Sequence, residues 1–249
     1  MNFILLLYSA FFPIAIFLFL IYRKDDDKEP PELLLKCFLW GCVITLPVIF
    51  AAEWLSDNYI VTSNFWSSFF YAFVISGFLQ EVTKFLCLYL IIWKHKEFDQ
   101  YIDGIIYAVF ISLGFALMEN LGHILLPYLF DLDFYQAVGI AFTRFFIDVP
   151  AHLFFGVIMG YFFACAKFSE QSQSKKMLCF SLCIPLLLNG IYNFSALYFT
   201  PINEGAFKTL TFPFILVFIM LFIIVWILIS KTKQKDKEKR IHDMLNRNY

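Results

Sequence analysis

Ionisable side chains interrupt the long apolar stretches of this 249-residue chain, and their types are those used in acid–base chemistry. The most informative are Glu81, Glu119 and His152, each of which stands among Phe, Leu, Ile and Ala residues. Two carboxylates and an imidazole in a low-dielectric site can activate water, because a desolvated Glu takes up a proton and a His orients or donates one. The same three side chains could instead hold a divalent metal with an open position, as catalytic zinc sites do.

Further polar residues accompany these three at helical spacing. Lys84 follows Glu81 by three positions. Arg144, Asp148 and His152 are successive i,i+4 neighbours on one helical face. Ionisable groups are costly in a bilayer, so each one is a functional-site hypothesis by default. The supporting residues of the candidate site are Gln80, Lys84, Asn120, Arg144, Asp148, Asn189 and Asn193.

The composition places this chemistry in a membrane. Hydrophobic residues make up 61% of the chain and aromatic residues 21%. Charged residues make up only 16%, whereas a soluble domain carries about 25%. A water-soluble enzyme has no place for this much Phe, Leu and Ile, and the aromatic content excludes a disordered chain. The net charge of −1 and the scattered basic residues argue against a nucleic-acid partner, so the expected surroundings are a lipid bilayer.

Seven apolar stretches are long enough to be transmembrane helices, since a hydrocarbon core of about 30 Å needs roughly 20 helical residues. The sequence therefore predicts an all-α polytopic membrane protein. One helical domain is expected over residues 1–230, with a motif-bearing core at 65–199, followed by a basic cytoplasmic tail at 231–249. No oligomeric state follows from the chain. The predicted spans are Asn2–Tyr22, Leu33–Ala52, Phe65–Trp93, Ile105–Leu126, Tyr135–Ala166, Met177–Phe199 and Leu210–Ser230.

The distribution of basic residues predicts the orientation. Positively charged flanks stay on the cytoplasmic side of a membrane. Every lysine and arginine outside the spans, except Lys208, falls in the segments that follow the first, third, fifth and seventh spans. This alternation predicts an outside N-terminus and a cytoplasmic C-terminus for a multi-pass protein of the cell membrane.

The polar residues lie at similar depth in four consecutive predicted spans. Glu81, Glu119 and His152 are about 12 to 14 residues from the cytoplasmic ends of their spans, or roughly 18–21 Å at 1.5 Å per residue. We therefore expect spans three to six to enclose a polar chamber, with the other three as outer supports. Gly156 and Gly160 form a small-x-x-x-small pair, which is expected to allow close helix packing.

Three interpretations remain open from spacing alone. The polar residues could form a buried ion-pair network that fixes helix packing, with Lys84 and Arg144 neutralising the carboxylates. They could line a proton or ion path through a transporter. They could also form the active site of a hydrolase.

Four segments at these residues resemble motifs of the PrsW family of intramembrane proteases, which is related to the CAAX-endopeptidase-like superfamily. The motifs have the same order on consecutive spans, and the likeness covers nearly half of the chain. The segments are Gly77–Lys84, similar to Glu-Glu-x-x-Lys; Asp103–Tyr107 with Gly114–Asn120, similar to Asp-Gly followed by Phe-x-x-x-Glu-Asn; Arg144 with Val149–Gly160, similar to a motif built on His-x-x-x-Gly; and Leu188–Phe194, similar to His-Gly-x-Tyr-Asp-Phe.

The resemblance implies an intramembrane endopeptidase of metallo- or glutamic type, which cleaves membrane proteins such as single-pass anti-sigma factors in bacterial signalling. It assigns Glu81, Glu119 and His152 to the active site, with Lys84 as their ion-pair partner. Glu81 is then expected to take the proton from water, while Glu119 and His152 stabilise the oxyanion or hold a metal. Zn²⁺ at these three residues and the absence of any cofactor are equally compatible with the motifs.

Three residues depart from the family pattern. Gln80 stands where the first Glu is expected, Asn189 where the fourth-motif His is expected, and Asn193 where an Asp is common. Gln cannot act as a general base, and Asn is a weaker metal ligand than imidazole. If the chemistry needs those groups, the chain is a pseudoprotease that binds membrane helices without cutting them. If Glu81 serves as the base, activity is retained.

Overall fold

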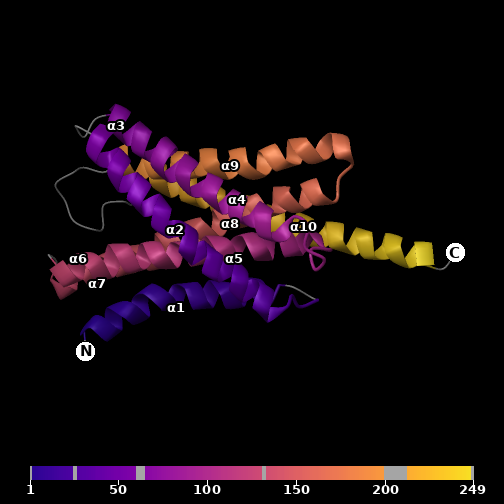
Figure 1. The fold of residues 1–249 in the computed structure, drawn as a ribbon, viewed down its shortest axis with the longest axis horizontal. Coiled ribbons are helices and arrows are strands. Elements are labelled where there is room, and N and C mark those ends of the chain that lie inside the picture. The colour runs from indigo at the N-terminus through magenta and orange to yellow at the C-terminus, as the bar shows by residue number, and fades with distance from the viewer. Residues whose placement is uncertain (1, 25–26, 60–64, 131–132, 199–211, 248–249) are drawn as a thin grey trace.

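The computed structural model describes residues 2–24, 27–59, 65–130, 133–198 and 212–247, and within these ranges every regular element is a helix. The helices form one elongated bundle, in which α1 begins and α10 ends at opposite ends (Figure 1). The helices are α1 (Asn2–Tyr22), α2 (Pro31–Tyr59), α3 (Phe65–Phe70), η1 (Tyr71–Leu79), α4 (Gln80–Ile92), α5 (Tyr101–Asn120), η2 (Leu121–Leu125), α6 (Leu126–Phe130), α7 (Phe134–Thr143), η3 (Arg144–Asp148), α8 (Val149–Lys167), α9 (Gln171–Tyr198) and α10 (Phe212–Arg247).

These elements make seven spans, which confirms the all-α transmembrane architecture. Among the described residues, seven continuous helical stretches are long and apolar enough to cross a membrane. Three of them are composite: α3, η1 and α4 form the third span, α5, η2 and α6 the fourth, and α7, η3 and α8 the fifth. In each composite span a π-helical segment, labelled η, joins two α-helices. The outside position of the N-terminus stays a prediction.

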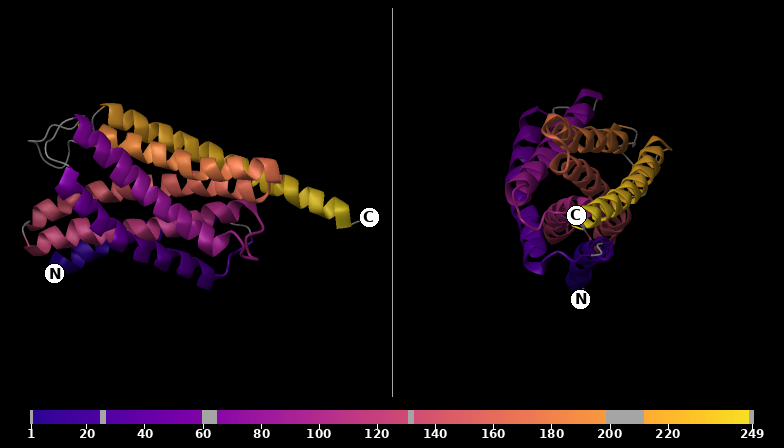
Figure 2. Two further views of the ribbon diagram at one scale, coloured as in Figure 1. Left: turned by 45° about the horizontal axis from the view of Figure 1, so that its top comes forward. Right: turned by 90° about the vertical axis from the view of Figure 1, so that its right-hand side faces the viewer.

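Several helices extend beyond their predicted bounds, and they do so at both sides: α2 runs to Tyr59 and not to Ala52, and α9 begins at Gln171 and not at Met177. The first span matches its predicted bounds, whereas α10 runs past the predicted end at Ser230 and continues as helix to Arg247. The basic segment is therefore a continuation of the seventh helix over most of its length. Helix α10 lies along α8 and α9, and its last turns extend beyond the rest of the bundle (Figure 2). Phe199 and Leu210, two predicted span ends, lie outside the described residues.

Helices α5 and α8 form the centre of the bundle, and most of their residues are buried. They approach closely because glycines face each other: a Cβ atom at Gly160 would lie 2.3 Å from the carbonyl oxygen of Gly104. On the other face of α5, a Cβ at Gly114 would lie 2.1 Å from the carbonyl oxygen of Phe38 in α2. The expected close packing at Gly160 is thus confirmed. Because these glycines have no side chains, α2, α5 and α8 can lie in direct backbone contact.

We expect Gly160→Val to destabilise the bundle by about 1–3 kcal/mol, because the added atoms overlap backbone that cannot move without shifting α5. The measurement is the midpoint of thermal unfolding in detergent. The matched control is Gly122→Ala, since a Cβ at Gly122 meets nothing within 4 Å. Equal midpoints for the Gly160 variant and the unsubstituted protein would contradict the packing argument.

Candidate active site

Three π-helical segments place the polar residues. Segment η1 ends at Leu79, directly before Gln80 and Glu81, η2 begins directly after Asn120, and η3 runs from Arg144 to Asp148. A π turn inserts one residue into the α-helical ladder and is frequent at functional sites. At the end of η3, for example, the backbone N–H of Val149 donates to the carbonyl of Arg144, five residues back. Each segment therefore changes which side chains of its span face the interior.

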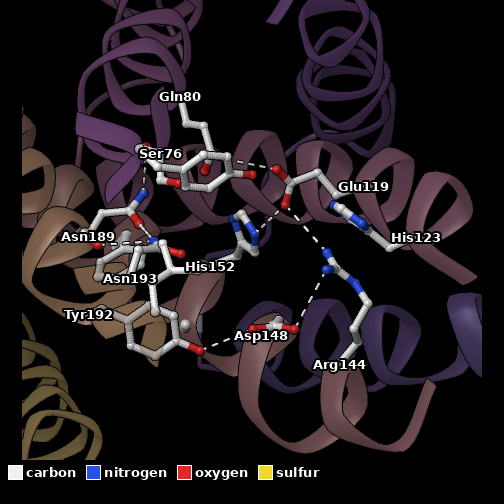
Figure 3. A pocket seen from close by; sticks show the side chains of 14 residues that line it. Ser76, Gln80, Glu119, His123, Arg144, Asp148, His152, Asn189, Tyr192 and Asn193 are labelled. Atoms are coloured by element: carbon white, nitrogen blue, oxygen red, sulfur yellow. Dashed lines mark hydrogen bonds and ion pairs between the residues drawn. The ribbon is translucent and has the colours of Figure 1, made fainter. Parts of the chain in front are cut away.

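The carboxylate of Glu119 is the hub of the site. Its Oε1 accepts a hydrogen bond of 2.8 Å from the side-chain amide of Gln80. Its Oε2 lies 2.9 Å from Nε2 of His152 and 3.4 Å from Nη2 of Arg144. Side chains from the third, fourth and fifth spans thus converge on one carboxylate, as Figure 3 shows.

Arg144 connects this hub to the first and sixth spans. Its Nε donates to Oδ1 of Asn120 at 2.6 Å, and the Asn120 amide donates to a backbone carbonyl of α1 at 3.2 Å. Its Nη1 lies 3.6 Å from Oδ2 of Asp148, whose Oδ1 accepts the hydroxyl of Tyr192 at 3.1 Å. Asp148 thus helps to neutralise the guanidinium of Arg144.

Glu81 and Lys84 form a buried ion pair behind His152. Nζ of Lys84 lies 2.9 Å from Oε1 of Glu81, and the two side chains are 2% and 0% exposed. The same ammonium lies 3.1 Å from Nδ1 of His152 and 4.7 Å from the ring centroid of Phe115. The other oxygen of Glu81, Oε2, has no hydrogen-bond partner within the described part of the chain. The carboxylate of Glu81 is therefore linked to His152 through Lys84.

These contacts favour one tautomer of His152. A charged Lys84 has only donors, so Nδ1 of the ring accepts its hydrogen bond. Nε2 then carries the ring hydrogen and donates it to the carboxylate of Glu119. The backbone carbonyl of His152 accepts the Ser112 hydroxyl at 2.7 Å, which ties this turn of α8 to α5. The imidazole is thus held at both ring nitrogens, with Nε2 directed at Glu119.

The residues that depart from the family pattern make good hydrogen bonds in this chain. The Gln80 amide donates to Glu119, which an ionised Glu at that position could not do. The Asn189 amide donates to Oε1 of Glu81 at 2.7 Å and to the backbone carbonyl of Ser76 at 3.1 Å. The Asn193 amide donates in turn to Oδ1 of Asn189 at 2.5 Å. The substitutions therefore keep the site connected without adding charge.

A cavity of about 220 Å³ lies against these side chains, and it is formed by spans three to six, as predicted. Most of the predicted site residues line it, but Glu81 and Lys84 lie behind the wall, and Asn120 is likewise outside the lining. The residues that line the cavity are Tyr71, Ser76, Gln80, Glu119, His123, Arg144, Asp148, Ala151, His152, Phe155, Asn189, Tyr192, Asn193 and Leu197 (Figure 3).

The sequence did not identify several residues of this cavity. Tyr71 precedes the first motif by two turns, at the start of the π segment η1, and it lines the cavity. Tyr192 stands inside the fourth motif, at the position of the motif's Tyr, so the motif could have identified it. His123 lines this cavity and also a second one of about 350 Å³, which Glu53 and Glu119 share. The Glu119 carboxylate therefore stands between two cavities.

The fold and the site together define a class of protein, a polytopic membrane protein with a polar chamber of carboxylate, imidazole and guanidinium groups at its centre. Comparison with known families assigns the chain more closely. Residues 29–228 match the family described as PrsW family intramembrane metalloprotease. The chain therefore belongs to the PrsW family of intramembrane proteases, which are hydrolases.

Similar curated proteins all come from bacteria and carry the name Protease PrsW. The protein of Oceanobacillus iheyensis is 36% identical over 174 residues, which is 70% of this chain and 74% of that protein. The protein of Bacillus subtilis is 36% identical over the same coverage, and that of Clostridioides difficile is 34% identical over 187 residues, 74% of this chain and 76% of that protein. No solved structure matches. With its seven apolar helices, the chain is a multi-pass protein of a bacterial cell membrane.

The side chains as arranged do not fit the metal in the family's description. Among the described ranges, no group of three or more His, Cys, Asp or Glu side chains is placed to hold a metal ion. Lys84 is paired with Glu81, and Arg144 with Glu119. Both ring nitrogens of His152 face other side chains, so a divalent ion would have to displace a cation to reach two carboxylates.

We expect Glu81→Gln and Lys84→Met each to lower the thermal-unfolding midpoint in detergent. Removing one member of a buried ion pair leaves an uncompensated charge, at a cost of about 3–5 kcal/mol. The double variant has no such charge and is expected to be more stable than the sum of the single effects predicts. Additive losses in this cycle would show that Glu81 and Lys84 do not interact.

Proposed function

We propose that this protein is an intramembrane endopeptidase in which Glu119 and His152 activate water for attack on a peptide bond of a membrane protein. The observation that carries the proposal is the position of the Glu119 carboxylate, which borders the polar cavity and lies 2.9 Å from the imidazole of His152. Membership of the PrsW family supports the reaction class.

In the proposed reaction Glu119 takes a proton from a water molecule in the cavity. The hydroxide oxygen attacks the carbonyl carbon of the scissile peptide bond. The resulting oxyanion is stabilised by two donors, the Nε2–H of His152 and the side-chain amide of Gln80. The proton then passes from Glu119 to the leaving nitrogen as the C–N bond breaks. Gln80, a departure from the family pattern, thus acts as a neutral donor and needs no ionisation.

Glu81 has a positioning role in this proposal, which differs from the role expected from the motif. Its carboxylate does not line the cavity, and it contacts Lys84 and Asn189. Through Lys84 it keeps Nδ1 of His152 as an acceptor, so that Nε2 carries the hydrogen that faces Glu119. Asp148 and Tyr192 hold Arg144, which keeps Glu119 paired in the resting enzyme.

The substrates proposed are membrane proteins, with single-pass anti-sigma-factor-like proteins as the first to test. Water has a separate route to Glu119 in this scheme, through the second cavity lined by Glu53 and His123. A peptide segment in the first cavity then need not block the supply of water.

We expect Glu119→Gln and His152→Phe to lower the cleavage rate in lipid nanodiscs by about 10²–10⁴-fold, because each removes a group that acts on protons in the reaction. The assay follows cleavage of single-pass membrane proteins from the host bacterium. Glu97→Gln, a change in a loop carboxylate next to Lys96, serves as the control and is expected to keep full activity.

The double variant Glu81→Gln/Lys84→Met tests which carboxylate is the base. Measurable cleavage by this variant, with none by Glu119→Gln, supports Glu119. The reverse result would restore Glu81 to the role of base. Binding of membrane helices without cleavage, on a panel that another PrsW protein cuts, would identify the chain as a pseudoprotease.

Chelators are expected to leave cleavage unchanged, since the two carboxylates and the imidazole are already held by Lys84 and Arg144. The measurement compares the cleavage rate before and after treatment with a strong zinc chelator, together with the metal content of the purified protein. Loss of activity on chelation, restored by Zn²⁺, would show that the ion pairs rearrange around a metal.

A further inference from the structure

A basic cavity lies at the end of the bundle that carries the basic segments, and it shares no lining residue with the polar chamber. Its volume is about 240 Å³. It is bounded by the turn after α1, by the first residues of α5 and by the continuation of α10. The residues that line it are Lys24, Ile102, Lys233, Asp236, Lys237 and Arg240.

Four of these six side chains are cationic, and three of them form one stripe on α10. Lys233, Lys237 and Arg240 follow each other at spacings of four and three residues. Like charges at these spacings destabilise a helix unless an anion lies between them. Lys24 adds a fourth cation from the turn after α1, and it is exposed, as are Lys233 and Lys237. The stripe therefore favours a negatively charged occupant.

The carboxylate in the cavity, Asp236, is shared between the stripe and the backbone of α5, and Arg240 also donates to Oε1 of Gln100 at 3.0 Å. Oδ1 and Oδ2 of Asp236 accept the backbone N–H groups of Tyr101 and Ile102 at 2.6 and 3.0 Å, so Asp236 caps the first turn of α5. Asp25 and Asp26, which follow Lys24, lie outside the described residues.

The cavity lies at the level of the lipid headgroups. Lys233 is about 21 residues from the first residue of α10, which is about 32 Å at 1.5 Å per residue. Lys24 is about 22 residues from the first residue of α1, or about 33 Å. Both distances match a hydrocarbon core of about 30 Å, so the cations of the two helices meet where lipid phosphates are found.

We propose that this cavity binds the headgroup of an anionic phospholipid. Basic cavities between transmembrane helices at the membrane boundary are suited to anionic headgroups. The occupant pairs with the stripe on α10 and with Lys24, and thereby holds the continuation of α10 against α1 and α5. Because Asp236 in the same cavity caps α5, and α5 carries Glu119, the lipid also stabilises the helix that positions the carboxylate of the site.

The first test is native mass spectrometry of the full chain in detergent, with equal amounts of phosphatidylglycerol and phosphatidylcholine. We expect one phosphatidylglycerol to bind preferentially. Lys233→Gln/Lys237→Gln is expected to weaken that binding by about thirtyfold, since each lysine at a membrane surface contributes about a factor of five. The matched control, Lys231→Gln/Lys175→Gln, removes the same charge from two exposed lysines outside the cavity and is expected to change binding less than about twofold.

A second measurement separates a lipid from free phosphate. Hydrogen exchange at the amides of Tyr101 and Ile102 is expected to slow when phosphatidylglycerol replaces phosphatidylcholine in nanodiscs. Inorganic phosphate added to the phosphatidylcholine nanodiscs is expected to have no effect. Equal loss of binding in the two double variants, or protection by inorganic phosphate alone, would overturn the proposal. Neither readout depends on peptide cleavage, so the result stands apart from the proposed activity.

Discussion

The need to satisfy charges far from water governs the arrangement of this bundle. Glu81 and Lys84 are almost fully buried, and Glu119, Arg144 and His152 are nearly so. An unpaired charge at such a depth costs several kcal/mol, so each of these groups needs a partner, and most of them find one on a neighbouring helix. The resulting contacts connect the first, third, fourth, fifth and sixth spans, and they leave the Glu119 carboxylate at the edge of a cavity.

The backbone meets this requirement in two ways. Glycines at the contacts of α5 with α2 and α8 let the helices approach closely, which brings the partners within hydrogen-bond distance. The π segments rotate the polar residues of three spans toward a common centre. In a third span that was α-helical throughout, Tyr71 and Gln80 would not both face the cavity, because the number of residues per turn between them would differ. Close packing and local irregularity are therefore both part of how the site is built.

Much of this could be predicted from the sequence, and the remainder has physical reasons. Hydropathy identified all seven spans, since a bilayer demands long apolar helices, and the depth of Glu119 and His152 predicted their layer. Sequence periodicity assumes 3.6 residues per turn, so it could not show that η1 turns Glu81 behind the cavity wall and brings Tyr71 into it. The helical continuation of α10 was also missed, because its lysines resemble a solvated tail until Asp236 meets the first turn of α5.

The length of α10 has a mechanical consequence. Its 36 residues form one helix of about 54 Å, whereas the hydrocarbon core is about 30 Å thick. A transmembrane helix adjusts to a thinner or thicker bilayer mainly by tilting. Because α10 is unbroken, a change of its tilt within the bilayer also moves its protruding end. That movement strains the contact between Asp236 and the first turn of α5. Bilayer thickness therefore acts on the same helix that carries Glu119.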